Sequence, residues 1–317
     1  MDEPILIITG PTAVGKTALA EIIATRIDGE IISADSRQIY RYLTIGTAKP
    51  IGVWQTISPA NKIYTVNNIF YHLVDFLEPT RRFSAGEFAD QSRKIIAQIQ
   101  KRKHRPLIVG GTGLYIHSLI SGLAPLPSAD QNIRKKYHQI LETRGRIYLS
   151  EKLARIDPVL AAKIGPNPQR LIRALEIFEL TGKSPRDFYS RTKPFIHNYY
   201  LINLDLPREI LASRIEARLK RMLKSGWLEE TEKVLKQKYP PDCPGLQSIG
   251  YPEIISYLNK KISYTEMTEQ IFVSSKQYAK RQQTWARGHN YPTLNIWQMS
   301  TQSIVNYILQ HSNIKVF

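Results

Sequence analysis

The fold of this chain is decided by its first strand and the loop that follows it. Residues 5–17 read Ile5-Leu6-Ile7-Ile8-Thr9-Gly10-Pro11-Thr12-Ala13-Val14-Gly15-Lys16-Thr17. The last eight match the pattern G-x-x-x-x-G-K-[ST] between an apolar strand and a helical stretch, 17–26. The glycines let backbone N–H groups surround a phosphate, Lys16 adds a mobile positive charge, and the Thr17 hydroxyl can ligate Mg²⁺. The stretch therefore predicts a phosphate-binding loop, and it leaves open whether ATP is the ligand.

Three further apolar stretches have the length and composition of buried strands. They are Glu30–Ser33, Pro106–Val109 and Tyr199–Leu204, and helical patterns separate them. Apolar strands that alternate with helices are typical of a parallel sheet covered on both faces. We therefore predict an α/β fold with a P-loop NTPase-like parallel sheet core. Two long amphipathic helices are expected after it, over about 208–238 and 265–288.

Asp35 follows the second predicted strand and supplies a carboxylate near the phosphate loop. Ligands of open parallel sheets bind at the carboxyl ends of the strands, so Asp35 should face this loop. ATPases and GTPases usually carry an acid at the end of a later strand. Here the strand 107–109 ends in Gly110-Gly111-Thr112-Gly113 instead, which argues against ordinary triphosphate hydrolysis. The alternative interpretations are a helix N-cap for Asp35 and a plain turn residue for Thr112.

The chain is strongly basic, which indicates a polyanionic partner. Its 317 residues include 44 Lys and Arg against 27 Asp and Glu, a formal net charge of +17. The hydrophobic content of 42% excludes a disordered chain, and no apolar run is long enough to suggest a membrane span. Nucleic acid is the favoured partner, with a merely basic surface as the alternative. The single Cys243 and the acidic start Met1-Asp2-Glu3-Pro4 predict a cytoplasmic protein without a signal peptide.

A helical insertion is predicted to interrupt the α/β core. Residues 117–197 carry 14 basic and 7 acidic residues and are the most basic part of the chain per residue. They contain the helical stretches Asn132–Thr143 and Gln169–Leu180, the second of which is stopped by Gly182. We therefore expect a core made of residues 1–116 and 198–317, with the helical domain inserted between them.

Motifs along most of the chain resemble those of one enzyme family. The matching stretches are Gly10–Thr17, Asp35-Ser36-Arg37-Gln38-Ile39-Tyr40, Gly46-Thr47-Ala48-Lys49-Pro50, His72-Leu73-Val74-Asp75, Gly110-Gly111-Thr112-Gly113-Leu114-Tyr115, Gln169-Arg170-Leu171-Ile172-Arg173-Ala174-Leu175-Glu176, Ile249-Gly250-Tyr251 and Ala279-Lys280-Arg281-Gln282-Gln283-Thr284-Trp285. In order and spacing they resemble the tRNA dimethylallyltransferases, also called tRNA isopentenyltransferases, over about residues 4 to 290.

This resemblance implies a reaction without triphosphate chemistry. A dimethylallyl group would pass from dimethylallyl diphosphate to N6 of adenosine 37 in tRNA, flipped out beside the anticodon, and diphosphate would leave. The phosphate loop would hold the diphosphate, with Mg²⁺ on Thr17. Asp35 would be the general base for a poorly nucleophilic amine, and Thr112 would contact the target nucleotide. Arg218, on a helical face with Arg214, would stabilise the departing diphosphate.

The resemblance also assigns the RNA contacts. Those in the adenine pocket, beside Asp35 and Thr112, are Ser36, Arg37 and Gln38. Those in the inserted segment are Arg134, Gln169, Arg170, Leu171, Ile172 and Arg173. Those in the last third of the chain are Gln247, Gly250, Tyr251, Lys280 and Arg281. We expect the enzyme to act as a monomer.

Three departures from the family pattern stand out. Pro168 follows Pro166-Asn167 where the family commonly has an acidic residue, and this stretch is one residue short. Pro252 stands where a basic residue is frequent, so one RNA contact is expected to be missing. Residues 51–70 are longer than usual and carry Trp54 and other aromatic side chains, as either a lid or a surface excursion.

Three other functions compete with tRNA prenylation. A relative that prenylates free AMP or ADP would need no basic insertion of this size. A nucleoside or nucleotide kinase on the same fold would need an adenine site for ATP and lid arginines, which the sequence does not place. A non-catalytic RNA-binding protein would leave tRNA unchanged in the presence of the prenyl donor.

Overall fold

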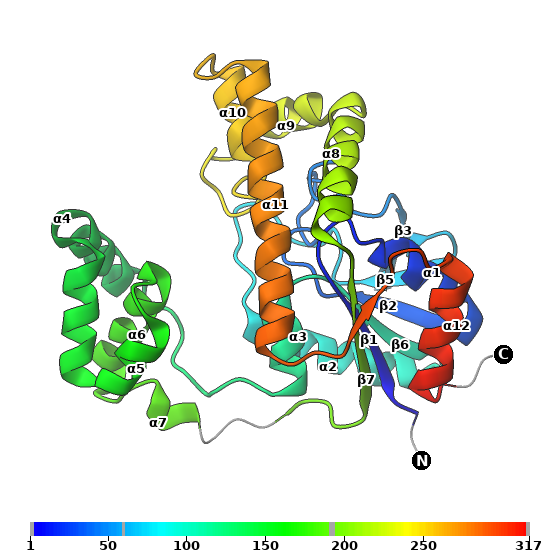
Figure 1. The fold of residues 1–317 in the computed structure, drawn as a ribbon, viewed down its shortest axis with the longest axis horizontal. Helices are drawn as coiled ribbons and strands as arrows, with labels where there is room; N and C mark the ends of the chain where they lie inside the picture. Colours follow the sequence, from blue (N-terminus) through cyan, green and yellow to red (C-terminus); the bar gives the residue numbers. More distant parts are fainter. Residues whose placement is uncertain (1–2, 59–60, 190–193, 315–317) are drawn as a thin grey trace. The chain divides into compact units, whose positions relative to one another are not determined.

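The computed structural model describes residues 3–58, 61–189 and 194–314, and Figure 1 shows its fold. The acidic start Met1-Asp2 and part of the 51–70 segment, residues 59–60, lie outside this range. The strands are β1 (Ile5–Thr9), β2 (Gly29–Ser33), β3 (Val53–Ser58), β4 (Asn61–Val66), β5 (Ile69–His72), β6 (Arg105–Val109), β7 (Tyr199–Asp205) and β8 (Thr293–Asn295). The helices are α1 (Lys16–Ile27), α2 (Ala85–Lys101), α3 (Gly113–Ile120), α4 (Gln131–Ile156), α5 (Pro158–Ile164), α6 (Pro168–Thr181), α7 (Arg186–Tyr189), α8 (Arg208–Lys224), α9 (Trp227–Lys236), α10 (Tyr251–Leu258), α11 (Tyr264–Gly288) and α12 (Thr301–Ser312). No described helix is long and apolar enough to cross a membrane.

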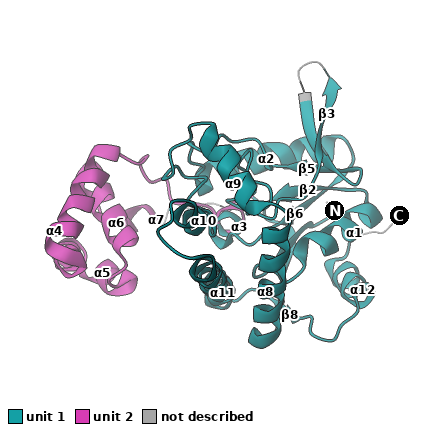
Figure 2. Ribbon diagram, turned by 90° about the horizontal axis from the view of Figure 1, so that it is seen from above, with its two compact units in different colours: residues 1–117, 196–317 teal, residues 118–195 magenta. Residues whose placement is uncertain are grey.

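The chain divides into two compact units, which Figure 2 colours separately. Unit 1 consists of residues 1–117 and 196–317, and unit 2 of residues 118–195. These seams lie within two residues of the boundaries that the sequence suggests. Unit 2 contains helices but no strand among its described residues.

Unit 1 is built on one eight-stranded sheet with the order β3-β4-β5-β2-β6-β1-β7-β8. Six neighbouring strands pair in parallel, in the order β5, β2, β6, β1, β7 and β8, which confirms the predicted parallel core. At one edge, β4 pairs antiparallel with β5 and β3 pairs antiparallel with β4. This antiparallel extension, which the sequence pattern did not predict, is formed by the long segment 51–70.

Successive side chains of the central strands point to opposite faces of the sheet, and both faces are covered. Leu6 and Ile8 of β1 belong to one apolar cluster with α1 and α12, whereas Ile5 and Ile7 are also buried and point to the opposite face. On that face, Phe88 of α2 stacks on Tyr115 of α3, with ring centroids 4.4 Å apart. Such two-sided burial favours strands that are apolar at most positions.

The predicted long helix over 208–238 is wrong, because the chain breaks after α8. Ser225 and Gly226 separate α8 from α9, and Gly226 has φ 93°, a left-handed conformation that L side chains rarely adopt. The break allows the Trp227 side chain to pack against Tyr251 of α10 in a second apolar cluster. The second predicted helix is confirmed as α11 (Tyr264–Gly288).

Unit 2 is organised around a buried carboxylate as well as an apolar core. Leu149, Leu153, Leu171 and Leu175 are fully buried between α4 and α6. The Glu176 side chain, with no exposed surface, accepts hydrogen bonds from the Asp130 backbone N–H (2.7 Å) and from Arg134 Nε (3.1 Å) and Arg173 Nη1 (2.7 Å). The carboxylate therefore ties the start of α4 to α6.

Replacing Glu176 by Ala is expected to destabilise unit 2 by about 2–4 kcal/mol, because two arginines and an amide lose a buried acceptor. Amide hydrogen exchange of residues 131–181 in the full-length chain would report the change. Glu142→Ala, at an exposed site of α4, is the control and should change exchange little. Equal exchange in the two variants would contradict the role given to Glu176.

Candidate active site

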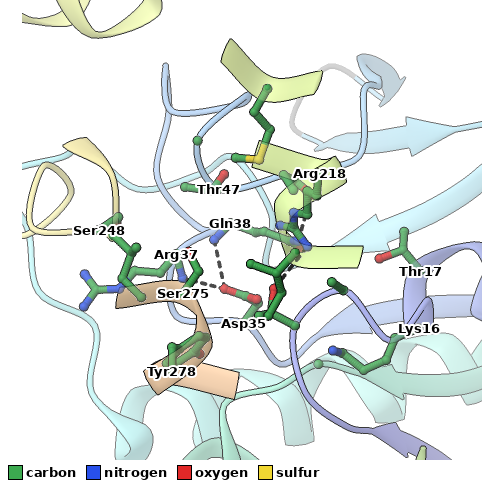
Figure 3. A pocket seen from close by; sticks show the side chains of 18 of the residues that line it. Lys16, Thr17, Asp35, Arg37, Gln38, Thr47, Arg218, Ser248, Ser275 and Tyr278 are labelled. Carbon is green, nitrogen blue, oxygen red and sulfur yellow. Dashed lines mark hydrogen bonds between the residues drawn. The ribbon is translucent and has the colours of Figure 1, made fainter. Parts of the chain in front are cut away.

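A cavity of about 970 Å³ opens at the carboxyl ends of the parallel strands of unit 1. The phosphate loop, the segments after β2 and β6, and one side each of α8 and α11 line it. Figure 3 shows Lys16 and Thr17 on one side of Asp35, and Arg37 and Tyr278 on the other. The cavity therefore has two distinct sides that meet at one carboxylate.

The phosphate loop has the backbone that its sequence predicts. Gly10 has φ 146°, and a Cβ there would lie 2.5 Å from the Leu204 carbonyl oxygen of β7, so only glycine fits. Ala13 and Gly15 also have positive φ values, of 64° and 107°. Helix α1 then begins at Lys16, so its first N–H groups face the loop and favour an anion.

Three cations converge on the phosphate loop. Lys16 Nζ donates to the carbonyl oxygens of Gly10 and Pro11, both at 2.9 Å. From α8, Arg218 Nη1 donates to Thr12 Oγ1 (3.1 Å), and Arg214 Nη1 donates to the Val14 carbonyl oxygen (3.1 Å). Their spacing of four residues places both arginines on one face of α8, as predicted.

The electrostatics of this cluster favour an anionic ligand. Burial lowers the pKa of the Lys16 ammonium to about 8; the Asp35 carboxylate raises it and Arg218 lowers it further. Burial also lowers the pKa of the Arg218 guanidinium, against the influence of Asp35. An arginine nevertheless stays charged in proteins. A bound diphosphate would relieve the repulsion between these two cations.

Asp35 combines a structural role with an available carboxylate oxygen. Its Oδ1 accepts from the backbone N–H groups of Arg37 (2.8 Å) and Gln38 (3.3 Å), which fixes the turn after β2. The alternative interpretation of Asp35 as a helix N-cap is wrong, because a turn and not a helix follows it. Among the described residues, the hydrogen bonds of the Asp35 side chain go to Oδ1, and Asp35 lines the cavity. One oxygen can therefore hold the turn while the other accepts a proton.

The side chains next to Asp35 are fixed by short-range hydrogen bonds. Thr112 Oγ1 accepts from the Ser36 backbone N–H at 3.0 Å, which joins the turn after β2 to the turn after β6. Gln38 Nε2 donates to the Ala48 carbonyl oxygen (3.1 Å), and its Oε1 accepts from Ser33 Oγ (3.2 Å). Arg37 Nη1 donates to the Pro244 carbonyl oxygen (3.0 Å). The structure thus brings the predicted residues Ser36, Arg37, Gln38 and Thr112 together around Asp35.

Helix α11 contributes two site residues that the sequence analysis did not single out. Gln282 Oε1 accepts from the Thr12 backbone N–H (2.8 Å), and its Nε2 donates to the Gly111 carbonyl oxygen (2.9 Å). Tyr278 lines the cavity one turn earlier, and burial, assisted by Asp35, raises the pKa of its phenol to about 12. The spacing of Ile271, Ser275, Tyr278 and Gln282, which puts them on one helical face, is the sequence signal for this wall.

The predicted RNA contacts in the last third of the chain separate into three groups. Gln247 and Arg281 are exposed and line the cavity. Lys280 is exposed beside a separate cavity of about 330 Å³ between α8 and α11. Gly250 and Tyr251 are buried, and the RNA contacts expected of them stay predictions.

Glu230 explains why Gly250 and Tyr251 belong to a motif. Its carboxylate accepts from the backbone N–H groups of residues 44, 45 and 46 and from Tyr251 Oη, the last at 2.6 Å. Any Cβ at Gly46 or Gly250 would lie 2.0–2.1 Å from the indole of Trp227. The contacts of Glu230 and Trp227 therefore fix the part of the cavity wall that includes Gly46.

The predicted RNA contacts of unit 2 are only partly accessible. Leu171 and Ile172 are buried in its core, in the apolar stripe of α6, and the RNA contacts expected of them stay predictions. Arg134 and Arg173 are engaged with Glu176 but keep 30% of their side-chain surface exposed. Gln169 and Arg170 are exposed at the start of α6.

The two proline departures have a structural explanation. Pro168 stands in the first turn of α6, where Asn167 Oδ1 accepts from the Arg170 backbone N–H at 3.1 Å. Pro252 stands in the first turn of α10. Proline suits the first turn of a helix, because those N–H groups have no partner within the helix.

Comparison with known proteins identifies the family of this chain. A family model described as IPP transferase matches residues 38–289. The chain belongs to the tRNA dimethylallyltransferase family. A tRNA dimethylallyltransferase of Elusimicrobium minutum is 40% identical over 284 residues, which cover 88% of this chain and 90% of that protein. One of Geobacter sulfurreducens is 38% identical over 286 residues, covering 89% and 88%.

Solved structures of the tRNA dimethylallyltransferase family share the fold. The tRNA isopentenylpyrophosphate transferase of Bacillus halodurans superposes with a TM-score of 0.66 at 34% identity, covering 98% of this chain and 97% of that one. A eukaryotic dimethylallyltransferase acting on tRNA gives a TM-score of 0.76 at 25% identity, covering 99% and 81%. Membership of this family makes the chain a prenyltransferase, with the P-loop core that the sequence predicts.

Proposed function

We propose that this chain transfers a dimethylallyl group from dimethylallyl diphosphate to N6 of adenosine 37 of a tRNA. The observation that carries the proposal is the two-sided cavity. On one side are the cations and N–H groups of the phosphate loop, and on the other are the polar side chains around Asp35. A diphosphate suits the first side and a nucleobase the second, so the donor carbon and the acceptor nitrogen would meet beside the carboxylate.

Asp35 is the group that activates the acceptor in this proposal. The lone pair of an exocyclic amine is delocalised into the adenine ring, which makes the amine a weak nucleophile. As the N6–carbon bond forms, N6 becomes positively charged and must lose a proton, which Asp35 Oδ2 accepts. The N–H groups of Arg37 and Gln38 hold Oδ1, so the carboxylate keeps its orientation during the transfer.

The phosphate loop stabilises the leaving group. Breaking the carbon–oxygen bond leaves the bonding electron pair on the diphosphate, whose negative charge increases. Lys16 and Arg218 are held at the loop by Gly10 and Thr12, and the first N–H groups of α1 lie beside them, so these groups are placed to bind the diphosphate and stabilise its added charge. Arg214 holds the loop backbone at Val14.

Mg²⁺ fits this site through the Thr17 hydroxyl at the start of α1. The ion takes several of its ligands from phosphate oxygens and water, and the Thr17 hydroxyl, which lines the cavity, would supply a protein ligand. When bound, it neutralises part of the diphosphate charge. ATP, a second polyphosphate, could compete for the same loop.

Unit 2 and the exposed cations Arg170 and Arg281 are proposed to hold the RNA. Flipping the adenosine costs a few kcal/mol of unstacking, least in a loop, and phosphate contacts offset this cost. We predict that tRNA affinity falls about 10- to 100-fold between 50 and 200 mM salt, as counterion release requires for several phosphate contacts. Filter binding or fluorescence titration measures it, and a flat response would contradict the electrostatic role.

The reaction can be tested directly. Purified protein is incubated with dimethylallyl diphosphate, Mg²⁺ and unmodified tRNA, and the nucleosides are analysed by mass spectrometry. We expect N6-dimethylallyladenosine from tRNA and none from AMP. Prenylated AMP would favour the free-nucleotide alternative, a phosphorylated nucleoside would favour a kinase, and unchanged tRNA would favour a binding protein. The monomeric state and the cytoplasmic location stay predictions.

A further inference from the structure

The antiparallel strands β3 and β4 contact the segments around the cavity through two aromatic side chains: Tyr64 of β4 donates to the carbonyl oxygen of the cavity-lining Pro50 at 2.8 Å, and Trp54 of β3 contacts Asp75. Trp54 lies on the edge strand β3, keeps 42% of its surface exposed, and meets Tyr64 of β4 edge to face, with ring centroids 5.6 Å apart. Its Nε1 donates a hydrogen bond to Asp75 Oδ2 at 3.0 Å. An exposed indole contributes little to the core, so this directed hydrogen bond is its most specific contact.

Asp75 connects the hairpin to Gln38 of the site. The Asp75 backbone N–H donates to the Gln38 carbonyl oxygen at 3.0 Å. Its Oδ1 accepts from Lys49 Nζ at 2.5 Å, and the residue has φ 56°, a left-handed conformation. Such a conformation costs free energy in a non-glycine residue and persists only where neighbouring contacts fix it. Both carboxylate oxygens of Asp75 provide such contacts.

Lys49 links Asp75 to the backbone that binds the side chain of Gln38. Its ammonium is completely buried and also donates to the Tyr40 carbonyl oxygen. The next residue back along the chain, Ala48, accepts the hydrogen bond from Gln38 Nε2. Asp75 therefore fixes the backbone of Gln38 directly, and fixes the acceptor of its side chain through Lys49.

We propose that the β3–β4 hairpin positions Gln38 for the target adenosine, and that Trp54 is the positioning residue that acts through Asp75. This inference rests on the proposed function, in which Gln38 lines the adenine pocket. Under this proposal the long 51–70 segment contributes to the reaction, although Trp54 itself does not line the cavity. Without its hydrogen bond, Asp75 and the wall 46–50 would sample more conformations.

Trp54→Phe tests the proposal because it removes the N–H donor while keeping an aromatic ring against Tyr64. We expect kcat/KM for tRNA to fall about fivefold, a typical effect of losing a partly exposed hydrogen bond to a charged group. KM for the prenyl donor should stay unchanged, and the melting temperature should fall by no more than about 2–4 °C. Amide exchange of residues 44–49 should become faster. The control Ile57→Thr, at an exposed site of the same strand, should match the native chain in all four measurements.

A double-mutant cycle separates positioning from a general structural effect. If Trp54 acts through Gln38, Trp54→Phe should cost nothing further in a Gln38→Ala background. Fully additive losses, or unchanged amide exchange in Trp54→Phe, would overturn the inference. A native chain that does not prenylate tRNA would instead refute the proposed function, while the exchange experiment would still test the connection from Trp54 to the wall.

Discussion

Asp35→Asn is expected to lower the turnover of tRNA prenylation by about 10²- to 10⁴-fold, the usual contribution of a general base. The amide keeps the shape of the side chain and an oxygen that can accept from Arg37 and Gln38, so the turn after β2 should persist. What is lost is the ability of the second oxygen to accept the proton of N6. Single-turnover measurements at saturating donor and tRNA would report this change.

Substrate binding should change little in the same variant. Asp35 stands beside Lys16 and Arg218, and its removal takes one negative charge away from the diphosphate side. Donor affinity should therefore not weaken, and tRNA affinity should change less than about threefold, within ~0.7 kcal/mol. Asp35→Ala also removes the turn contacts, so its extra loss over Asp35→Asn measures the structural role. A loss of tRNA binding equal to the loss of turnover in Asp35→Asn would remove Asp35 from the base role.

The parts of the site that the sequence predicts are those encoded by local geometry. The phosphate loop is one continuous octapeptide, and Asp35 follows directly from the rule that ligands bind where parallel strands end. Arg218 lies four residues from Arg214, so helical periodicity alone places both on one face. In each case the neighbours along the chain determine the position of the side chain.

The parts that the sequence does not predict depend on contacts distant in the chain. Gln282 reaches Thr12 across 270 positions, and Glu230 accepts from N–H groups 184–186 positions earlier. No periodicity encodes such partners. The sequence does not predict the hairpin β3–β4, because strand β3 is exposed along its whole length and lacks the apolar pattern of a core strand.

Family motifs also mix catalytic and structural residues, and only the fold separates them. Tyr251 lies in a matching motif but is buried against Glu230, whereas Gln247, just before the motif, is exposed at the cavity. In unit 2, Leu171 belongs to the core although the exposed Arg170 precedes it. A motif thus identifies the family, and burial then decides which of its residues can touch RNA.

Lys16→Met is expected to lower kcat/KM for the prenyl donor by about 10²- to 10³-fold, as removal of a preorganised group for transition-state charge does. Methionine keeps much of the length of the side chain without the ammonium that faces the leaving diphosphate. The matched control is Lys220→Met on α8, which removes the same charge from a side chain 74% exposed and paired with Glu216. The control should retain native kinetics, because exposed ion pairs contribute little.

The pH dependence of donor binding identifies the lysine independently of turnover. Because the pKa of Lys16 is lowered to about 8, its ammonium is largely protonated below pH 8 and loses its proton above it. A bound diphosphate favours the charged form and raises this pKa, so binding above pH 8 takes up a proton. Above pH 7, where the diphosphate itself is almost fully ionised, donor affinity should therefore fall as the pH rises through about 8 toward 9.5. Isothermal titration across this range should show the fall in the native chain and in Lys220→Met, and a flat profile in Lys16→Met. The same fall in Lys16→Met would assign the titration to another group and contradict the role of Lys16.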